Sequence, residues 1–202
     1  MMNSMIDFAQ ERQKALDWAY ATIYGEPFVV LDTETTNFPD KGGEIVQISV
    51  IGSNGYTLID QLVKPQGEIS PGAESVHHIS AEMVKDKPTF DEIYPTLVSM
   101  LGGKKIIAYN VAFDRVILNN TCTRYGLEII PARWECAMLQ YAAFNGEWDS
   151  YKNSFKWKKL GEACEQFKIS SEGAHDALAD VRMTLKLMEA MAAEKVAQEL
   201  VF

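Results

Sequence analysis

The stretch FVVLDTETT, residues 28–36, joins a run of apolar, mostly β-branched residues to two acids. Such a run is typical of a β-strand, which we expect from Phe28 to Glu34. Side chains two positions apart on a strand point to the same face, so Asp32 and Glu34 share a face. Carboxylates on a central strand are costly to bury unless a metal ion or another cation pairs with them. The alternative is that Asp32 merely ends the strand and begins a turn with Thr33.

Two more strands are expected immediately after this stretch. Residues 45–51 and 56–63 are again rich in β-branched residues with a period of two, and Asn54-Gly55 between them is a hairpin turn signal. The pattern therefore predicts three sequential antiparallel strands.

Beyond residue 80 the pattern changes to helices that alternate with a buried strand. Thr89 and Glu92 have the spacing of a capping box, which predicts a helix that ends at Leu101 before Gly102-Gly103. An apolar strand over residues 106–109 follows. Further helices are expected over residues 112–125, 137–144, 157–167 and 176–193. This order predicts an α/β domain whose sheet has an antiparallel flank and a parallel core covered by helices.

The N-terminal segment, residues 1–25, is expected to be a helical extension of the domain formed by residues 26–202. A helix is predicted from Ser4 to Tyr24, ended by Gly25. Its packing face would carry Phe8, Arg12, Ala15, Leu16, Ala19 and Ile23, which recur at helical spacing. The helix would pack on the domain or, alternatively, bind a partner protein.

Composition narrows the class of protein. The chain has 202 residues, of which 47% are apolar and 23% charged, as in globular domains. Nineteen basic and 28 acidic residues give a net charge of −9, which argues against nucleic-acid binding by bulk positive charge. Three cysteines without CxxC spacing support neither a disulfide framework nor a zinc finger. No apolar run reaches the roughly 20 residues of a membrane span, so we expect a soluble, cytoplasmic protein without membrane contact.

Two further acidic motifs complement Asp32 and Glu34. Asp114 ends the stretch YNVAFD, residues 109–114, just after a buried strand, where α/β proteins place their sites. The stretch HDALAD, residues 175–180, opens the last helix with His175 and Asp180. Taken singly, each has a simpler explanation, because acids are common in the first turn of a helix and on its solvated face.

Together, DTETT at 32–36, YNVAFD at 109–114 and HDALAD at 175–180 resemble, in this order, the three motifs of the DEDDh exonuclease family. That family includes the proofreading epsilon subunit of bacterial DNA polymerase III. VHHI at 76–79 and DKPTF at 86–90 resemble its linking segment, so the resemblance extends over residues 27–191. It implies an RNase H-like fold, a mixed five-stranded sheet flanked by helices, and removal of nucleotides in the 3′-to-5′ direction.

The resemblance also implies the roles of five residues. The metal-binding acids would be Asp32, Glu34, Asp114 and Asp180, and the general base would be His175. By the same analogy Asp32 bridges two Mg²⁺ or Mn²⁺ ions, while Asp114 supports the second ion directly or through water. Charge supports this, because two carboxylates about 4 Å apart repel by roughly 4 kcal/mol at an effective dielectric of 20. Oxygen ligands suit such hard cations. Since imidazole is largely neutral above about pH 7, activity should rise with pH between about 6 and 8.

The resemblance further implies where the 3′-terminal nucleotide binds. The expected contacts are Thr33, Thr35, Thr36, Phe38, Asn110 and Phe113. Two residues depart from the family pattern: Tyr109 stands where many relatives have His, and Asn37 where Gly is usual.

The expected function is metal-dependent hydrolysis at the 3′ end of DNA, single-stranded or frayed. An exoribonuclease resembling RNase T or oligoribonuclease, and an inactive module that binds nucleic acid or a polymerase, stay open as alternatives. A polymerase or other replication protein is a possible partner. The terminal QELVF, residues 198–202, faintly resembles a sliding-clamp peptide, although Glu199 breaks the pattern. The stretch at 151–159, with four lysines and three aromatics, would either contact a single strand or form a loop and the start of a helix.

Overall fold

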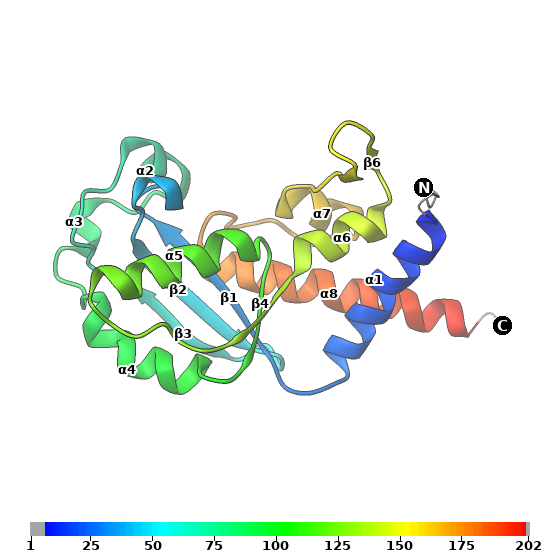
Figure 1. Ribbon diagram of the computed structural model, residues 1–202, viewed down its shortest axis with the longest axis horizontal. Coiled ribbons are helices and arrows are strands. Elements are labelled where there is room, and N and C mark those ends of the chain that lie inside the picture. Colours follow the sequence, from blue (N-terminus) through cyan, green and yellow to red (C-terminus); the bar gives the residue numbers. More distant parts are fainter. Residues whose placement is uncertain (1–6, 201–202) are drawn as a thin grey trace, which may run out of the picture.

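Strand β1 (Val29–Thr35) lies in the middle of a five-stranded sheet in this computed structural model, which describes residues 7–200 (Figure 1). β2 (Ile45–Gly52) pairs with it antiparallel, and β3 (Thr57–Leu62) pairs antiparallel with β2. On its other side β4 (Lys105–Ala108) runs parallel to β1, and β5 (Arg133–Cys136) runs parallel to β4. The expected antiparallel flank, parallel core and five-stranded mixed sheet are confirmed.

One face of the sheet is covered by the two ends of the described chain. α8 (Ala177–Glu199) packs on β1 and β2, and α1 (Phe8–Ile23) lies beside α8 and α6 (Ala137–Asn145), as Figure 1 shows in blue, red and yellow-green. Their apolar side chains form one core cluster with Val30 of β1. α1 is therefore built into the core on this side of the sheet.

The opposite face is covered by α4 (Phe90–Leu101) and α5 (Val111–Arg124). Because side chains alternate along β1, Val29 and Leu31 face these helices while Val30 faces α8. The capping box that was expected at the start of α4 is present, with Thr89 and Glu92 hydrogen-bonded to each other.

Several short elements have no counterpart in the sequence-based expectation. They are α2 (Pro71–His77), α3 (Ala81–Val84), the 3₁₀ turn η1 (Pro39–Lys41), and a hairpin of β6 (Trp148–Asp149) and β7 (Ser154–Phe155). β5 was also not predicted from its residues. All are too short for a hydrophobic period to mark them.

Some predicted boundaries were wrong. The helix expected over 157–167 is the shorter α7 (Leu160–Gln166), and Trp157 lies in the extended segment before it. α8 continues past the expected end at 193. α1 begins at Phe8, capped by Asp7, and the expected start at Ser4 lies outside the described residues, as do the last two residues of QELVF.

Within residues 7–200 all three cysteines are free thiols, two of them buried. Over the same residues, no helix combines the length and the apolar character needed to cross a membrane.

Candidate active site

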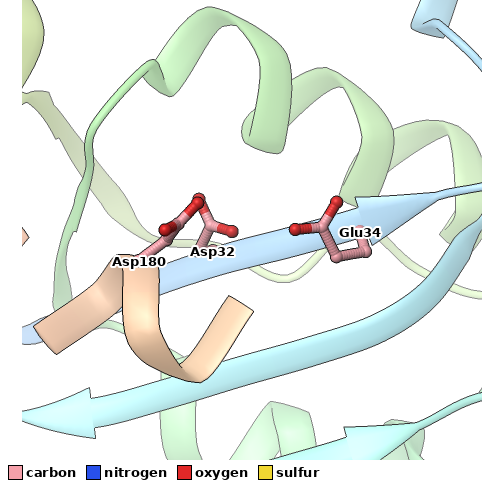
Figure 2. Close-up of side chains that lie close together, drawn as sticks. All are labelled: Asp32, Glu34 and Asp180. Atoms are coloured by element: carbon pink, nitrogen blue, oxygen red, sulfur yellow. The ribbon is translucent and has the colours of Figure 1, made fainter. Parts of the chain in front are cut away.

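Three acids meet where β1 and α8 face each other. Asp32 and Glu34 point from β1 toward Asp180, which lies in the first turn of α8 (Figure 2). One carboxylate oxygen of each residue lies within 4.8 Å of the others. The strand period that put Asp32 and Glu34 on one face thus directs both toward the acid from the last helix.

Asp114 approaches β1 from the opposite face of the sheet. It lies in the first turn of α5, is only 3% exposed, and accepts a hydrogen bond of 2.8 Å at Oδ1 from the Thr33 hydroxyl. Thr33 lies between Asp32 and Glu34 and therefore points to the α5 side. Asp114 is not part of the three-residue cluster, yet its charge reaches both Asp32 and Glu34.

Burial and mutual repulsion make these acids weak. Burial, followed by the charge of Asp114, raises the pKa of Asp32 well above its usual range. Burial and then the charge of Asp180 raise the pKa of Glu34 to about 8. For Asp114, burial outweighs the hydrogen bond from Thr33 and raises the pKa to about 7. Burial also raises the pKa of Asp180 to about 6, against favourable interactions with His175. The site thus needs positive charge to hold all four groups ionised near neutral pH.

One buried oxygen of the cluster has no hydrogen-bond partner. Within residues 7–200, Oδ1 of Asp180 is the only buried side-chain nitrogen or oxygen atom without a hydrogen-bond partner. A buried polar atom without a partner is costly, unless a ligand that binds there satisfies it. The donors at this point are carboxylate oxygens alone, which suit hard divalent cations such as Mg²⁺ or Mn²⁺. The residues present therefore fit a divalent metal site.

A fifth acid nearby, Asp176, is engaged elsewhere. Its Oδ1 caps α8 by accepting from the main-chain N–H of Ala179 (3.1 Å), and its Oδ2 accepts from the side-chain amide of Gln47 (3.1 Å). Gln47 is buried on β2, directly across from Glu34 in the strand register. Asp176 thus belongs to the structure of the helix start, and both its oxygens already have donors.

His175 immediately precedes this cap and is exposed at the wall of the cavity above the acids. Its backbone adopts a left-handed conformation with φ of 71°. That conformation is uncommon for a residue with a side chain. The turn places the imidazole near Asp180, whose pKa it lowers.

A cavity of about 700 Å³ opens over the four acids and His175. Most of the residues expected to bind the 3′-terminal nucleotide line it, namely Thr33, Phe38, Asn110 and Phe113. A second cavity of about 560 Å³ shares Glu34, Phe38 and Phe113 with the first, and Thr35 and His77 line it.

Thr36 is the one expected contact that lines neither cavity. It is buried, and its hydroxyl accepts a hydrogen bond from the main-chain N–H of Glu44 (2.9 Å). His77 is buried, with Nδ1 accepting a hydrogen bond from the Ile79 N–H (3.0 Å) and Nε2 3.1 Å from the Thr35 carbonyl. Both residues shape the loop after β1.

Two residues near the site were not recognised in the sequence. Gln47 was visible as a lone amide in the otherwise apolar run of β2, which is itself a signal for a buried hydrogen-bonding role. Tyr109 was noted only as a departure from a family pattern. Its hydroxyl donates a hydrogen bond of 2.8 Å to the carbonyl of Lys158, in the segment before α7. The partner of each lies far away in the sequence.

Comparison with known proteins gives a consistent result. The exonuclease family model RNase_T matches residues 29–188. The chain is 38% identical over 171 residues to the uncharacterized exonuclease CP81 of Escherichia phage 186, covering 81% of this chain and 87% of that protein. It is 27% identical to the DNA polymerase III subunit epsilon of Treponema pallidum, covering 90% of this chain and 84% of the subunit.

Other relatives are much longer than this chain, and solved structures share its fold. The match to the PolC-type DNA polymerase III of Thermotoga maritima, 34% identical, covers 79% of this chain but only 11% of that protein. The nuclease domain of 3′hExo, a DEDDh family member solved with rAMP, superposes with a TM-score of 0.66 at 19% identity, covering 85% of this chain and 94% of that one.

Proposed function

This chain belongs to the DEDDh exonuclease family with its RNase H-like fold, and we propose that within this family it hydrolyses phosphodiester bonds at the 3′ end of DNA. The observation that carries the proposal is the convergence of Asp32, Glu34 and Asp180 within 4.8 Å, with buried Asp114 behind β1. An inactive module has no physical need for four converging acids, one buried and three partly buried, whose charges repel.

The acids are proposed to hold two divalent ions, Mg²⁺ or Mn²⁺. Asp32, Glu34 and Asp180 offer oxygens to one shared position, and the partnerless Oδ1 of Asp180 supports this assignment. Asp114 would contribute through Oδ2, because Oδ1 is occupied by the Thr33 hydroxyl. When bound, a metal pair supplies an activated water and stabilises the charge on the phosphodiester oxygens. Thr33 fixes the Asp114 carboxylate, so its orientation is set before any ligand arrives.

His175 is proposed as the general base that takes a proton from the attacking water. Its imidazole is exposed to the cavity that opens over the four acids and lies near Asp180. Its place on the turn before α8 lets the proton pass on to solvent.

The 3′-terminal nucleotide is proposed to bind in the two joined cavities beside the acids. Thr35, Phe38 and Phe113 would surround the sugar and base, since the rings of Phe38 and Phe113 line both cavities. Asn110, which lines the first cavity, would also contact the nucleotide. The proposal of DNA, single-stranded or frayed at its 3′ end, rests on the first motif and on relatives that are DNA polymerase III subunits. Association with a polymerase stays a prediction.

The test is a cleavage assay on 5′-labelled single-stranded DNA and RNA of one sequence, with Mg²⁺ or with EDTA, beside Asp32→Ala. We expect a ladder that shortens from the 3′ end of DNA, requires metal and is lost in the variant. Faster shortening of RNA would assign the enzyme to exoribonucleases instead. If neither polymer shortens with Mg²⁺ or Mn²⁺, the proposed catalytic function is wrong.

A further inference from the structure

The segment 156–159, which is neither helix nor strand, contributes Trp157, Lys158 and Lys159 to one wall of the active-site cavity. Trp157 lines this cavity with a side chain that is 57% exposed, an unusual exposure for so large an apolar ring. Lys158 and Lys159 line the same wall. The helix expected over this segment would have placed these residues on a helical surface, but the structure leaves them extended beside the acids.

The wall is fixed by contacts to parts of the chain that lie outside it. Tyr109, which directly follows β4, donates a hydrogen bond of 2.8 Å from its hydroxyl to the Lys158 carbonyl. The Glu147 carboxylate forms ion pairs with the ammonium groups of Lys156 (2.8 Å) and Lys158 (2.6 Å). The main-chain carbonyl of Glu147 accepts a hydrogen bond from the Lys156 N–H (2.8 Å). A segment anchored on both sides presents Trp157 at a defined place, and ordering it costs little when a ligand binds.

The hairpin of β6 and β7 that precedes the wall is itself supported by α1. Phe8 makes edge contacts with Trp148 and Phe155, with ring centroids 5.9 and 5.8 Å away, and these two rings lie 5.1 Å apart. Figure 1 shows this hairpin beside α7 and near the start of α1. The N-terminal helix thus supports the wall of the cavity as well as the core.

The wall also carries local positive charge in an acidic protein. Residues 147–159 contain four lysines and two acids, whereas the whole chain has a net charge of −9. Tyr151, at the hairpin tip, is 95% exposed. Exposed aromatics interleaved with lysines are the features by which proteins bind single strands, through base stacking and contacts to the phosphate backbone.

Resting on the proposed exonuclease function, we propose that Trp157 is the stacking platform for the nucleotides that precede the 3′-terminal one, with Lys159 of this wall and Lys152 of the hairpin contacting their phosphates. Phe38 and Phe113 line the same cavity on the side of β1 and α5, next to the second cavity. A strand whose terminal nucleotide lies between these two rings would therefore leave along the Trp157 wall. The platform would favour unpaired strands, because its ring must contact a base face that is covered in a duplex.

The first experiment measures binding in EDTA, where cleavage is not needed. Fluorescence anisotropy with a labelled single-stranded 12-mer compares the wild type with Trp157→Ala, Trp157→Phe and Tyr56→Ala. Tyr56 is a matched control, since it is 74% exposed in the turn between β2 and β3 and lines neither cavity. We expect the alanine variant at 157 to weaken binding about tenfold, as for loss of one base stack. Trp157→Phe should retain most of the affinity and Tyr56→Ala all of it.

The second experiment separates the platform from the catalytic centre. It compares kcat/KM on the 12-mer with kcat/KM on thymidine 5′-p-nitrophenyl phosphate, which has no preceding nucleotide. Trp157→Ala should lower the ratio of these two values about tenfold, mainly through KM for the 12-mer. Equal losses on both substrates, or unchanged binding in EDTA, would overturn the platform. Absence of any cleavage by the wild type would refute the proposed function alone, because the binding result decides the platform independently.

Discussion

The side-chain amide of Gln47 donates hydrogen bonds to Asp60 (3.0 Å) and Asp176 (3.1 Å) and accepts one from the main chain of Ala177 (3.3 Å). One buried amide on β2 thereby ties the neighbouring strand β3 to the first turn of α8. Glu34 lies directly across from Gln47 in the strand register. The start of α8, which carries Asp180, is thus held in place relative to β1 by a residue that need not touch substrate.

We predict that Gln47→Leu lowers kcat tenfold or more and weakens Mn²⁺ binding. Leucine keeps the volume of the side chain but removes the donor to Asp176 Oδ2 and the acceptor for the Ala177 N–H at the start of α8. The rise in Tm that Mn²⁺ induces should become smaller and kcat should fall, while KM for thymidine 5′-p-nitrophenyl phosphate changes little. Gln61→Leu is the control, because among residues 7–200 the Gln61 amide bonds only to the adjacent Leu62 carbonyl. Wild-type kcat in Gln47→Leu would show that the helix start is held by other contacts.

His175→Ala should lose most turnover and keep metal binding. If the imidazole acts as the general base, its removal should lower kcat by roughly 10²- to 10⁴-fold. The acids stay in place, so the Mn²⁺-induced rise in Tm should stay close to that of the wild type. An unchanged kcat would remove His175 from the mechanism.

Glu34→Gln should stabilise the metal-free protein at high pH. Glu34 has a pKa of about 8 when folded, against 4.5 as its ordinary value. Between these pH values the native state binds more protons than the unfolded state, so this group lowers stability as pH rises from about 4.5 to 8. One pKa unit corresponds to about 1.4 kcal/mol. In EDTA at pH 8, the variant should therefore melt at least 3–6 °C above the wild type, with no such gain near pH 4.5. Equal melting at pH 8 would contradict the raised pKa.

Mn²⁺ should bind more tightly as pH rises. The pKa values of Asp180, Asp114 and Glu34 are raised to about 6, 7 and 8, so protons compete with the metal for these oxygens. Isothermal titration between pH 5.5 and 8.5 should show increasing affinity and release of protons on binding. Affinity that does not change with pH would mean that the acids are already ionised without metal.

Leu16→Ala should destabilise the whole domain by about 2–5 kcal/mol. Leu16 of α1 is 1% exposed and lies in the core cluster shared with α8. Leu139→Ala is the matched control, since that leucine is 57% exposed on α6. Urea unfolding measures both. If Leu16→Ala lowers the free energy of unfolding as little as Leu139→Ala does, the result would favour a division into an extension, residues 1–25, and a separate domain, residues 26–202. That division stays a prediction.

Much of the fold was predictable because its long elements have strong local patterns. The three antiparallel strands, the capping box at Thr89 and the helices that cover the sheet were each marked by hydrophobic period or turn residues. The pair Asp32 and Glu34 could be placed on one face from the strand period alone.

What the sequence could not predict depends on contacts between distant segments. No local pattern places Asp114 on the far side of β1, bonded to Thr33. Trp157 stands at helical spacing with Leu160 and Cys164 of α7, yet the Tyr109 hydroxyl and Glu147 hold its segment outside the helix. The role of Gln47 likewise requires α8 to be in place. In each case tertiary hydrogen bonds or ion pairs outweigh local propensity.

The order of the acids along the chain has a consequence for protein synthesis. Asp32, Glu34 and Asp114 are all translated before α8, which brings His175 at its start and Asp180 in its first turn. A nascent chain that stops short of this helix has three of the acids, but the α8 side of its sheet is uncovered. Under the proposed roles, the growing polypeptide cannot cut nucleic acid near the ribosome until the described chain is almost entirely made. A protease that cuts the finished molecule just before His175 removes the imidazole, Asp180 and α8 together.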